Sequence, residues 1–179
     1  MQCVPEGLQH LTALKRLLLA ENCLSAVPSL AGMSDLEKFT IRKNCLETLP
    51  PVMPGLATHC DKLCLANNAI SLLPPSIGDF SNMVQLDASF NKLESIPSEL
   101  GRCVALENLR LDHNEIQTLP SELGNLEALR YLDLSWNCLS EFPAFMPSLT
   151  RLRRLSVGSN EIEVFGAHFF ELHRMSMCI

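Results

Sequence analysis

Leucines and other apolar residues recur along this chain in one fixed arrangement, L-x-x-L-x-L-x-x-N, in which x is variable and mostly polar. A period this short leaves room for one strand and one return segment per repeat, and such a unit buries its apolar face only against its neighbours. The pattern therefore predicts a solenoid of stacked repeats, which offers a surface rather than an enclosed pocket. It occurs seven times, and its asparagines are separated by 22, 24, 23, 23, 23 and 23 residues: Asn22, Asn44, Asn68, Asn91, Asn114, Asn137 and Asn160.

The sixth copy shows the expected course of the chain most clearly. Leu129, Leu132 and Leu134 alternate with polar residues as in a strand, so they should point into the core. Asn137 then turns the chain, and its amide, which donates and accepts, should satisfy backbone groups of stacked bends. Pro120 begins the return segment, where no backbone donor is needed. Short returns of this kind favour 3-10 or irregular turns over full helices.

The repeats predict one elongated domain over residues 1–179, with seven full repeats and a partial eighth. The chain starts and stops inside a repeat: Val4-Pro5 corresponds to Leu119-Pro120, and Cys178 falls on the second strand position of the eighth copy. Solenoids usually carry polar caps over their terminal core layers. We therefore expect both ends to be uncapped, as in a part of a longer protein or a chain whose ends a partner covers.

The fuller phrase L-P-x-x-L-G-x-L-x-x-L-x-x-L-x-L-x-x-N-x-L resembles the intracellular leucine-rich repeat class shared by Ras-group leucine-rich repeat proteins, Ras suppressor protein and the Scribble and Erbin scaffolds. The resemblance is best between Leu119 and Leu139 and covers essentially the whole chain. It implies an α/β leucine-rich repeat fold: a right-handed superhelix or horseshoe with a parallel concave β-sheet and short 3-10 or irregular convex segments.

The same resemblance implies a non-enzymatic recognition module of a signalling or scaffold protein. Small GTPases, phosphatases and junctional signalling proteins are the partners that it suggests. Since the matching residues form the core that every member needs, they do not identify the partner.

The variable positions of the repeat line the concave sheet, so recognition should be encoded there. These positions carry ten of the 14 basic residues but only seven of the 20 acidic ones, which leaves a net charge of +3 on them and −9 on the rest of the chain. A basic concavity on an acidic body would steer an acidic protein surface toward itself, although the variable positions of any repeat protein carry charges. The total charge of −6 argues against nucleic-acid binding.

The position just before the asparagine carries Phe90, His113 and Trp136 in successive repeats. Such rings either cover the turn or form a binding stripe, because interface hot spots are rich in Trp, Tyr and Arg. Within the strands, Asp87, Arg110 and Asp133 should form a ladder of alternating charge across neighbouring strands. The predicted partner-binding set on the concave face is Phe90, Arg110, His113, Arg130, Tyr131, Trp136, Arg154, Lys38 and Arg42.

The sequence has no G-x-S-x-G, phosphate-binding glycine loop or H-E-x-x-H motif, so we expect no enzyme activity in these residues and no cofactor. The alternative is a targeting or regulatory segment of a larger kinase, phosphatase or GTPase-linked enzyme whose catalytic domain lies outside this chain. His59, Cys60 and Cys64 resemble metal ligands. However, Cys60 falls on a core position and Cys64 on the sheet face, so we expect no metal site.

The cysteines follow the repeat rather than forming a disulfide framework. Cys23, Cys45 and Cys138 each come directly after a repeat asparagine, and the cysteine caps of extracellular arrays are missing. This favours a reducing compartment, the cytoplasm. The apolar runs are too short to cross a bilayer, and residues 1–20 already follow the repeat, so no secretion signal is expected. Sensing of a microbial ligand is a less favoured alternative, because it would require a capped extracellular array or a nucleotide-binding domain.

Overall fold

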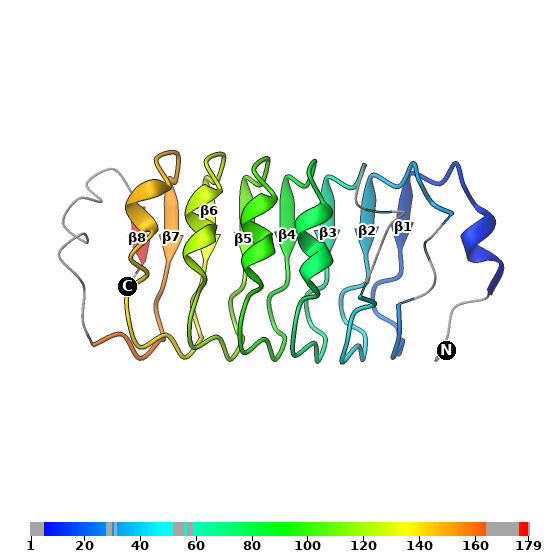
Figure 1. The fold of residues 1–179 in the computed structure, drawn as a ribbon. Coiled ribbons are helices and arrows are strands. Elements are labelled where there is room, and N and C mark those ends of the chain that lie inside the picture. Colours follow the sequence, from blue (N-terminus) through cyan, green and yellow to red (C-terminus); the bar gives the residue numbers. More distant parts are fainter. Residues whose placement is uncertain are drawn as a thin grey trace.

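The computed structural model describes residues 6–27, 30, 32–51, 56, 59–163 and 176–178. Eight short strands lie side by side in one parallel sheet, in the order in which they follow one another along the chain (Figure 1). Each strand comes from one copy of the repeat, which confirms the predicted solenoid. The strands are β1 (Arg16–Leu18), β2 (Lys38–Thr40), β3 (Lys62–Cys64), β4 (Gln85–Asp87), β5 (Asn108–Arg110), β6 (Tyr131–Asp133), β7 (Arg154–Ser156) and β8 (Ser176–Cys178).

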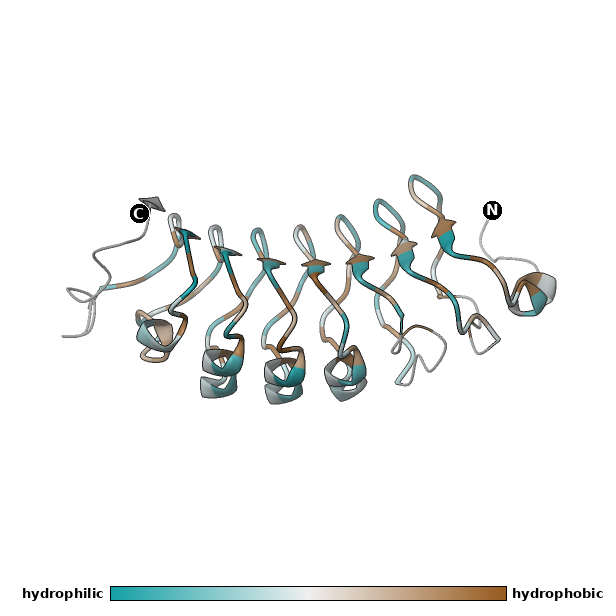
Figure 2. Ribbon diagram, turned by 90° about the horizontal axis from the view of Figure 1, so that it is seen from above, coloured by the Kyte–Doolittle hydropathy of each residue, from teal (hydrophilic) through white to brown (hydrophobic). Residues whose placement is uncertain are grey.

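The return segments lie on the opposite side from the sheet. Seen from above, the strands follow the inner side of a shallow arc and the 3-10 helices follow its outer side (Figure 2). A proline directly precedes three of these helices, where its fixed backbone angle suits the start of a helical turn: Pro74 before η2 (Pro75–Asp79), Pro97 before η3 (Ser98–Arg102) and Pro120 before η4 (Ser121–Asn125). The expected leucine-rich repeat horseshoe is thus confirmed. Its 3-10 helices are η1 (Glu6–His10), η2 (Pro75–Asp79), η3 (Ser98–Arg102), η4 (Ser121–Asn125) and η5 (Met146–Ser148).

The framework residues form one continuous apolar core between the sheet and the return segments. Leu129, Leu132 and Leu134 are each at most 1% exposed, as their alternation predicts. Cys60, which replaces a framework leucine, is fully buried in this core. The core therefore runs the length of the stack, and each layer is covered by the next repeat.

The repeat asparagines connect the stacked turns through their side-chain amides. Asn114 Nδ2 donates to the carbonyl oxygens of Leu111 (3.0 Å) and of Ala88 in the preceding repeat (3.1 Å). Asn114 Oδ1 accepts from the backbone N–H of Leu93 at 3.0 Å. The same bonds recur at Asn137, which confirms the column predicted from the sequence.

Glycines allow the return segments to approach one another closely. A Cβ atom added at Gly78 would lie 2.4 Å from the carbonyl oxygen of Glu99, and one at Gly101 would lie 2.3 Å from that of Glu122. Both distances are far inside van der Waals contact with backbone atoms. A side chain at either position would therefore push neighbouring return segments apart.

The eighth strand differs from the expected register by one residue. Leu155 of β7 lies opposite Met177, whereas a 23-residue step would have placed Cys178 there. The expectation for Cys178 is therefore wrong: the paired residues of β7 and β8 are 22 residues apart rather than 23, and loops absorb such changes at low cost. The expected lack of caps concerns the chain ends, and residues 1–5 and 179 lie outside the described residues. No described helix is long and apolar enough to span a membrane.

Candidate functional site

The residue before each repeat asparagine has a left-handed backbone conformation. The φ angle is 54° at Phe90, 55° at His113 and 56° at Trp136. A positive φ is uncommon for residues other than glycine and costs about 1–2 kcal/mol. The turn that brings the asparagine inward imposes this angle, and it leaves 42% of Phe90 and 59% of Trp136 exposed.

The three rings at this position form one continuous stack. The centroids of Phe90 and His113 are 4.0 Å apart with an interplanar angle of 15°. Those of His113 and Trp136 are 5.3 Å apart at 16°. His113 Nδ1 also lies 3.1 Å from Asp112 Oδ2, which fixes the orientation of the middle ring. The structure thus brings the predicted aromatic stripe together as a preorganised surface.

A buried charge pair lies beside this stack, in β5 and the turn that follows it. Arg110 Nε is 3.4 Å from Asp112 Oδ1, and the Asp112 side chain is only 5% exposed. Neither atom makes a hydrogen bond with another described residue, although both are inaccessible to solvent. Buried polar atoms are normally hydrogen-bonded, so these two atoms depend on their mutual charge attraction, which holds Arg110 at the centre of the face.

The expected ladder of Asp87, Arg110 and Asp133 is present in register but not in all its ion pairs. The three residues lie opposite one another in β4, β5 and β6. Arg110 Nη1 reaches Asp87 Oδ2 at 3.9 Å, whereas Asp133 Oδ2 accepts a 2.8 Å hydrogen bond from the Tyr131 hydroxyl. Within the described chain, Arg110 and Asp133 form no ion pair within 4 Å. Arg110 therefore turns toward β4 and Asp112 instead.

Two further basic residues frame Tyr131. The guanidinium carbon of Arg154 lies 5.0 Å from the centre of the Tyr131 ring, and Arg130 Nε lies 3.5 Å from Glu107 Oε2. Partial burial and the hydrogen bond to Asp133 raise the pKa of Tyr131 above its ordinary value, so its hydroxyl remains a donor. Seven of the predicted site residues thus gather over β4 to β7 and form the aromatic-basic patch: Phe90, Arg110, His113, Arg130, Tyr131, Trp136 and Arg154.

Lys38 and Arg42 lie elsewhere, so the predicted set divides into two groups. Both line a hollow of about 370 Å³ over β1 to β4. Lys62, which the sequence reasoning did not select, lines it as well. The signal was available, because Lys38 and Lys62 occupy the same position in successive repeats. The basic hollow is defined by its lining, which is Leu18, Ala20, Lys38, Thr40, Arg42, Lys62, Leu63, Cys64 and Gln85.

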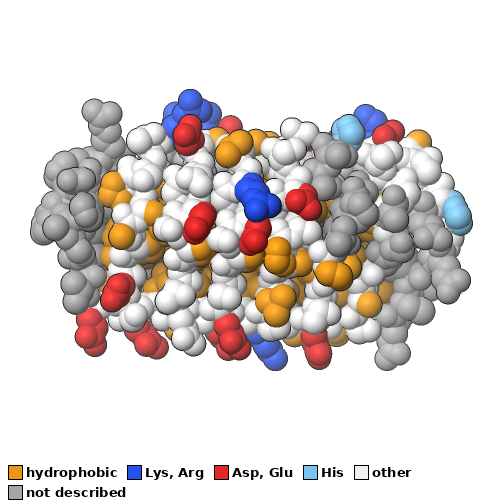
Figure 3. Space-filling view, viewed as in Figure 1, with side chains coloured by type: hydrophobic (Ala, Val, Ile, Leu, Met, Phe, Trp, Pro, Cys, Tyr) orange, Lys and Arg blue, Asp and Glu red, His pale blue; other side chains and the backbone are white. Residues whose placement is uncertain are grey.

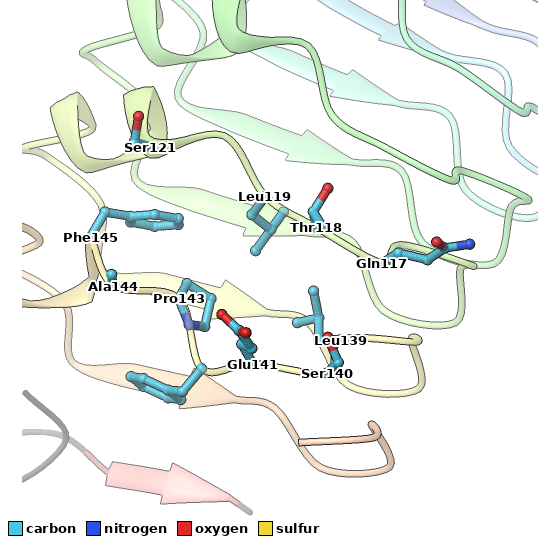
Figure 4. A pocket seen from close by; sticks show the side chains of 11 residues that line it. Gln117, Thr118, Leu119, Ser121, Leu139, Ser140, Glu141, Pro143, Ala144 and Phe145 are labelled. Carbon is cyan, nitrogen blue, oxygen red and sulfur yellow. The ribbon is translucent and has the colours of Figure 1, made fainter. Parts of the chain in front are cut away.

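The outer side of the molecule has the opposite charge character. Figure 3 shows the side that carries the 3-10 helices, where carboxylate side chains are spread over the surface and along one edge. A cavity of about 380 Å³ lies there between two successive return segments, with Leu119, Leu139 and Phe145 in its lining (Figure 4). Glu141 is the one ionisable residue in that lining. A general acid and base pair, which most hydrolytic chemistry needs, therefore does not line this cavity.

Two of the described thiols are buried and not activated. Burial raises the pKa of Cys60 and of Cys103 to about 11, so both stay protonated at neutral pH. Cys60 Sγ donates to the Lys62 carbonyl oxygen at 3.4 Å, while Cys64 lies on the sheet with Sγ 3.9 Å from Asp87 Oδ2. Cys60 and Cys64 thus point to opposite sides of the sheet, as expected. Among the described residues, no group of three or more His, Cys, Asp or Glu side chains is placed to bind a metal ion.

Comparison with known proteins places this geometry among leucine-rich repeats. Residues 81–139 and 104–162 match the family described as leucine rich repeat. Over 81 residues the chain is 35% identical to leucine-rich repeat serine/threonine-protein kinase 1 of Mus musculus. The matched region makes up 42% of this chain and 4% of the kinase.

Solved structures with the same fold cover almost the whole chain. A leucine-rich repeat protein of Leptospira interrogans superposes with a TM-score of 0.91 at 25% identity, over 97% of this chain and 44% of that one. The ectodomain of the plant membrane receptor kinase GASSHO1/SCHENGEN3 of Arabidopsis thaliana, in complex with Casparian strip integrity factor 2, gives 0.87 at 26% identity, over 98% of this chain and 22% of that one.

The chain thus spans less than half the length of each of these three proteins. One of them is a receptor ectodomain, so the narrower intracellular class stays a prediction. The repeat sequence, the stacked parallel strands and these matches support the leucine-rich repeat family for this chain, whose fold is a leucine-rich repeat solenoid.

Proposed function

We propose that this chain is a non-catalytic protein-interaction module that binds a protein partner through the aromatic-basic patch. Leucine-rich repeat domains are protein-interaction modules, and the plant ectodomain that shares this fold is seen in complex with Casparian strip integrity factor 2. The observation that carries the proposal is the exposed stack of three aromatic rings beside the Arg110 guanidinium. A partner that covers this region would bury the exposed surface of Phe90 and Trp136.

For the biological setting we propose the cytoplasm. Cys23 and Cys45 are exposed free thiols, which supports a reducing cytoplasmic setting for an intracellular signalling or scaffold protein. A small GTPase or phosphatase as partner stays a prediction from the resemblance. The partner is therefore best defined by chemistry: a protein surface with apolar groups and carboxylates.

The test compares two charge-matched double variants in capture from a lysate of the source cells. Trp136→Asn with Arg130→Gln removes one ring and one guanidinium from the patch. Asparagine keeps the left-handed turn, since Asn67 has φ 57° at the equivalent position. Val104→Asn with Arg102→Gln removes an exposed apolar residue and an arginine from a return segment and serves as the control.

We expect the patch variant to lose the proteins that the unmodified chain captures, while the control variant retains them. Both variants should unfold at the temperature of the unmodified chain in circular dichroism. The proposal fails if quantitative mass spectrometry finds the same captured proteins with the patch variant as with the control.

A regulatory repeat segment of a larger enzyme is the second candidate. It is favoured by the 35% identity to a protein kinase over 81 residues. The transcript sequence around this coding region would test it: an open reading frame that continues into a catalytic domain supports the candidate, and stop codons on both sides contradict it.

A further inference from the structure

The basic hollow is the second place on the sheet where charged side chains converge. Its lining includes three basic residues, Lys38, Arg42 and Lys62, and no acidic residue. Within the described chain, Arg42 lies within 4 Å of a carboxylate, whereas Lys38 and Lys62 do not. The described chain therefore neutralises the positive charge of the hollow only in part.

The two lysines are held close together by the sheet. Lys38 and Lys62 lie directly opposite each other in β2 and β3, and adjacent strands are about 4.8 Å apart. Like charges in this arrangement destabilise a sheet. Lys38 is also partly buried, whereas the other four lysines of the chain are exposed. In the described part of the chain, neither Lys38 nor Lys62 forms an ion pair within 4 Å.

Arg42 adds a third cation whose donors are largely free. Its nearest carboxylate, Glu21 Oε1, is 3.6 Å from Arg42 Nη2, but the same oxygen accepts a 3.0 Å hydrogen bond from Lys43 Nζ. Thr40 and Gln85 add a hydroxyl and an amide to the lining. The hollow thus combines three charged groups with neutral donors, which is the donor set that an anion of more than one charge requires.

We propose that the basic hollow binds a phosphoryl group carried by a side chain of the protein partner. Because it assumes a protein partner, this inference rests on the proposed function. A phosphoryl group carries a charge of about −1.5 to −2 and three acceptor oxygens, so it can contact several cations at once. A single carboxylate offers one charge and two oxygens. The residues that line the hollow come from β1 to β4, and these strands lie on the inner side of the arc (Figure 2), which a partner protein can enter.

The probe is a blocked pentapeptide, Gly-Gly-phosphoserine-Gly-Gly, titrated into the isotope-labelled chain and followed by NMR. Peptides with serine or glutamate at the centre are its matched controls. We expect the amide signals of β2 and β3 to shift with the phosphopeptide. Its affinity should exceed that of the glutamate peptide about fivefold, because the phosphoryl group has about twice the charge.

Lys38→Gln with Lys62→Gln should weaken binding of the phosphopeptide about tenfold or more, since it removes two charge-assisted contacts. Arg102→Gln with Arg151→Gln makes the same change in net charge on the return segments. This control should alter the affinity by less than about twofold, because exposed charges beyond a Debye length are screened.

Four results would overturn the inference: no shifts with the phosphopeptide, equal binding of the glutamate peptide, unchanged binding by the lysine variant, or tighter binding to vesicles containing a phosphorylated inositol lipid than to the phosphopeptide. The outcome is separable from that of the proposed function. If the lysine variant and phosphatase-treated lysate capture the same partner as before, only this inference fails. If the phosphopeptide binds the hollow but the patch variant captures the same proteins as its control, only the proposed function fails.

Discussion

At the residue scale, the side-chain amide of the repeat asparagine has different roles in different repeats. Asn114 is 8% exposed and bonds backbone atoms of two repeats. Asn22, in the first copy of the pattern, is exposed, and among the described residues its side chain bonds the carbonyl oxygens of Leu19 and Ala20 alone. The energetic importance of a repeat asparagine should therefore depend on whether a neighbouring repeat lies on its N-terminal side.

Asn114→Ala should lower the free energy of unfolding by about 2–3 kcal/mol, because it leaves the Leu93 N–H without a partner in the core. It also removes one of the two asparagine bonds to each of the Ala88 and Leu111 carbonyls, which keep their bonds from Asn91 and Asn137. Asn22→Ala should cost less than about 1 kcal/mol, since water replaces its bonds. Urea unfolding followed by circular dichroism measures both. Equal losses from the two variants would show that the bonds between repeats contribute little.

Arg110 is a second residue whose role emerges only from its contacts. Arg110→Ala should destabilise the chain by about 2 kcal/mol, because it removes the cation beside the buried Asp112 carboxylate, a loss moderated by the partial exposure of Arg110. Asp112→Ser in the same chain should recover at least half of the loss, since Ser89 and Ser135 occupy that position in the adjacent repeats. Thermal unfolding of the single and double variants tests this, and no recovery would contradict it.

At the scale of elements, the contact between return segments limits which residues the 3-10 helices accept. Gly101 of η3 approaches the backbone of η4, whereas Gly124 of η4 faces the side chain of Phe145, with 3.3 Å from its added Cβ to the Phe145 Cβ. Backbone cannot move aside without displacing the whole repeat, but a side chain can shift by a few tenths of an ångström. The two glycines thus occupy equivalent positions in sequence and different environments in space.

Gly101→Ala should destabilise the chain by about 1–3 kcal/mol, as for overpacking in a core. Gly124→Ala should be nearly neutral, because a smaller clash is offset by the lower entropy of the unfolded chain. Chemical unfolding of both variants gives the comparison. A neutral Gly101→Ala would mean that the return segments can separate at little cost.

At the scale of the whole molecule, charge is divided between the two sides of the arc. The variable strand positions carry a net +3 in a chain whose total charge is −6. Carboxylates are spread over the outer side (Figure 3). A field of this form should orient an acidic partner toward the sheet before contact.

The association rate with such a partner should therefore fall about tenfold between 50 mM and 500 mM NaCl, while the dissociation rate changes little. Surface plasmon resonance with the captured partner measures both rates. The Val104→Asn variant should show the same salt dependence, because it leaves the charges in place. An association rate independent of salt would remove electrostatic steering from the mechanism.

The sequence by itself determined the fold, because the repeat is written in residues whose roles are local. The framework leucines, Asn114 and Pro120 each fix a direction of the chain through burial, hydrogen bonding or a restricted backbone angle, and repetition multiplies the signal. It also predicted the aromatic stripe, since a column in the repeat becomes a row on the sheet. The sequence predicted the wrong register for Cys178, because the length of a return segment is weakly constrained by the repeat.

Only the tertiary structure decided how the site is divided. The predicted set separated into the aromatic-basic patch and the basic hollow, because the arc places Lys38 beside Lys62 and three strands away from Arg110. The direction of Arg110 and the need for Gly101 depend on packing between repeats. Such contacts are not encoded at any single position, so no pattern within one repeat could reveal them.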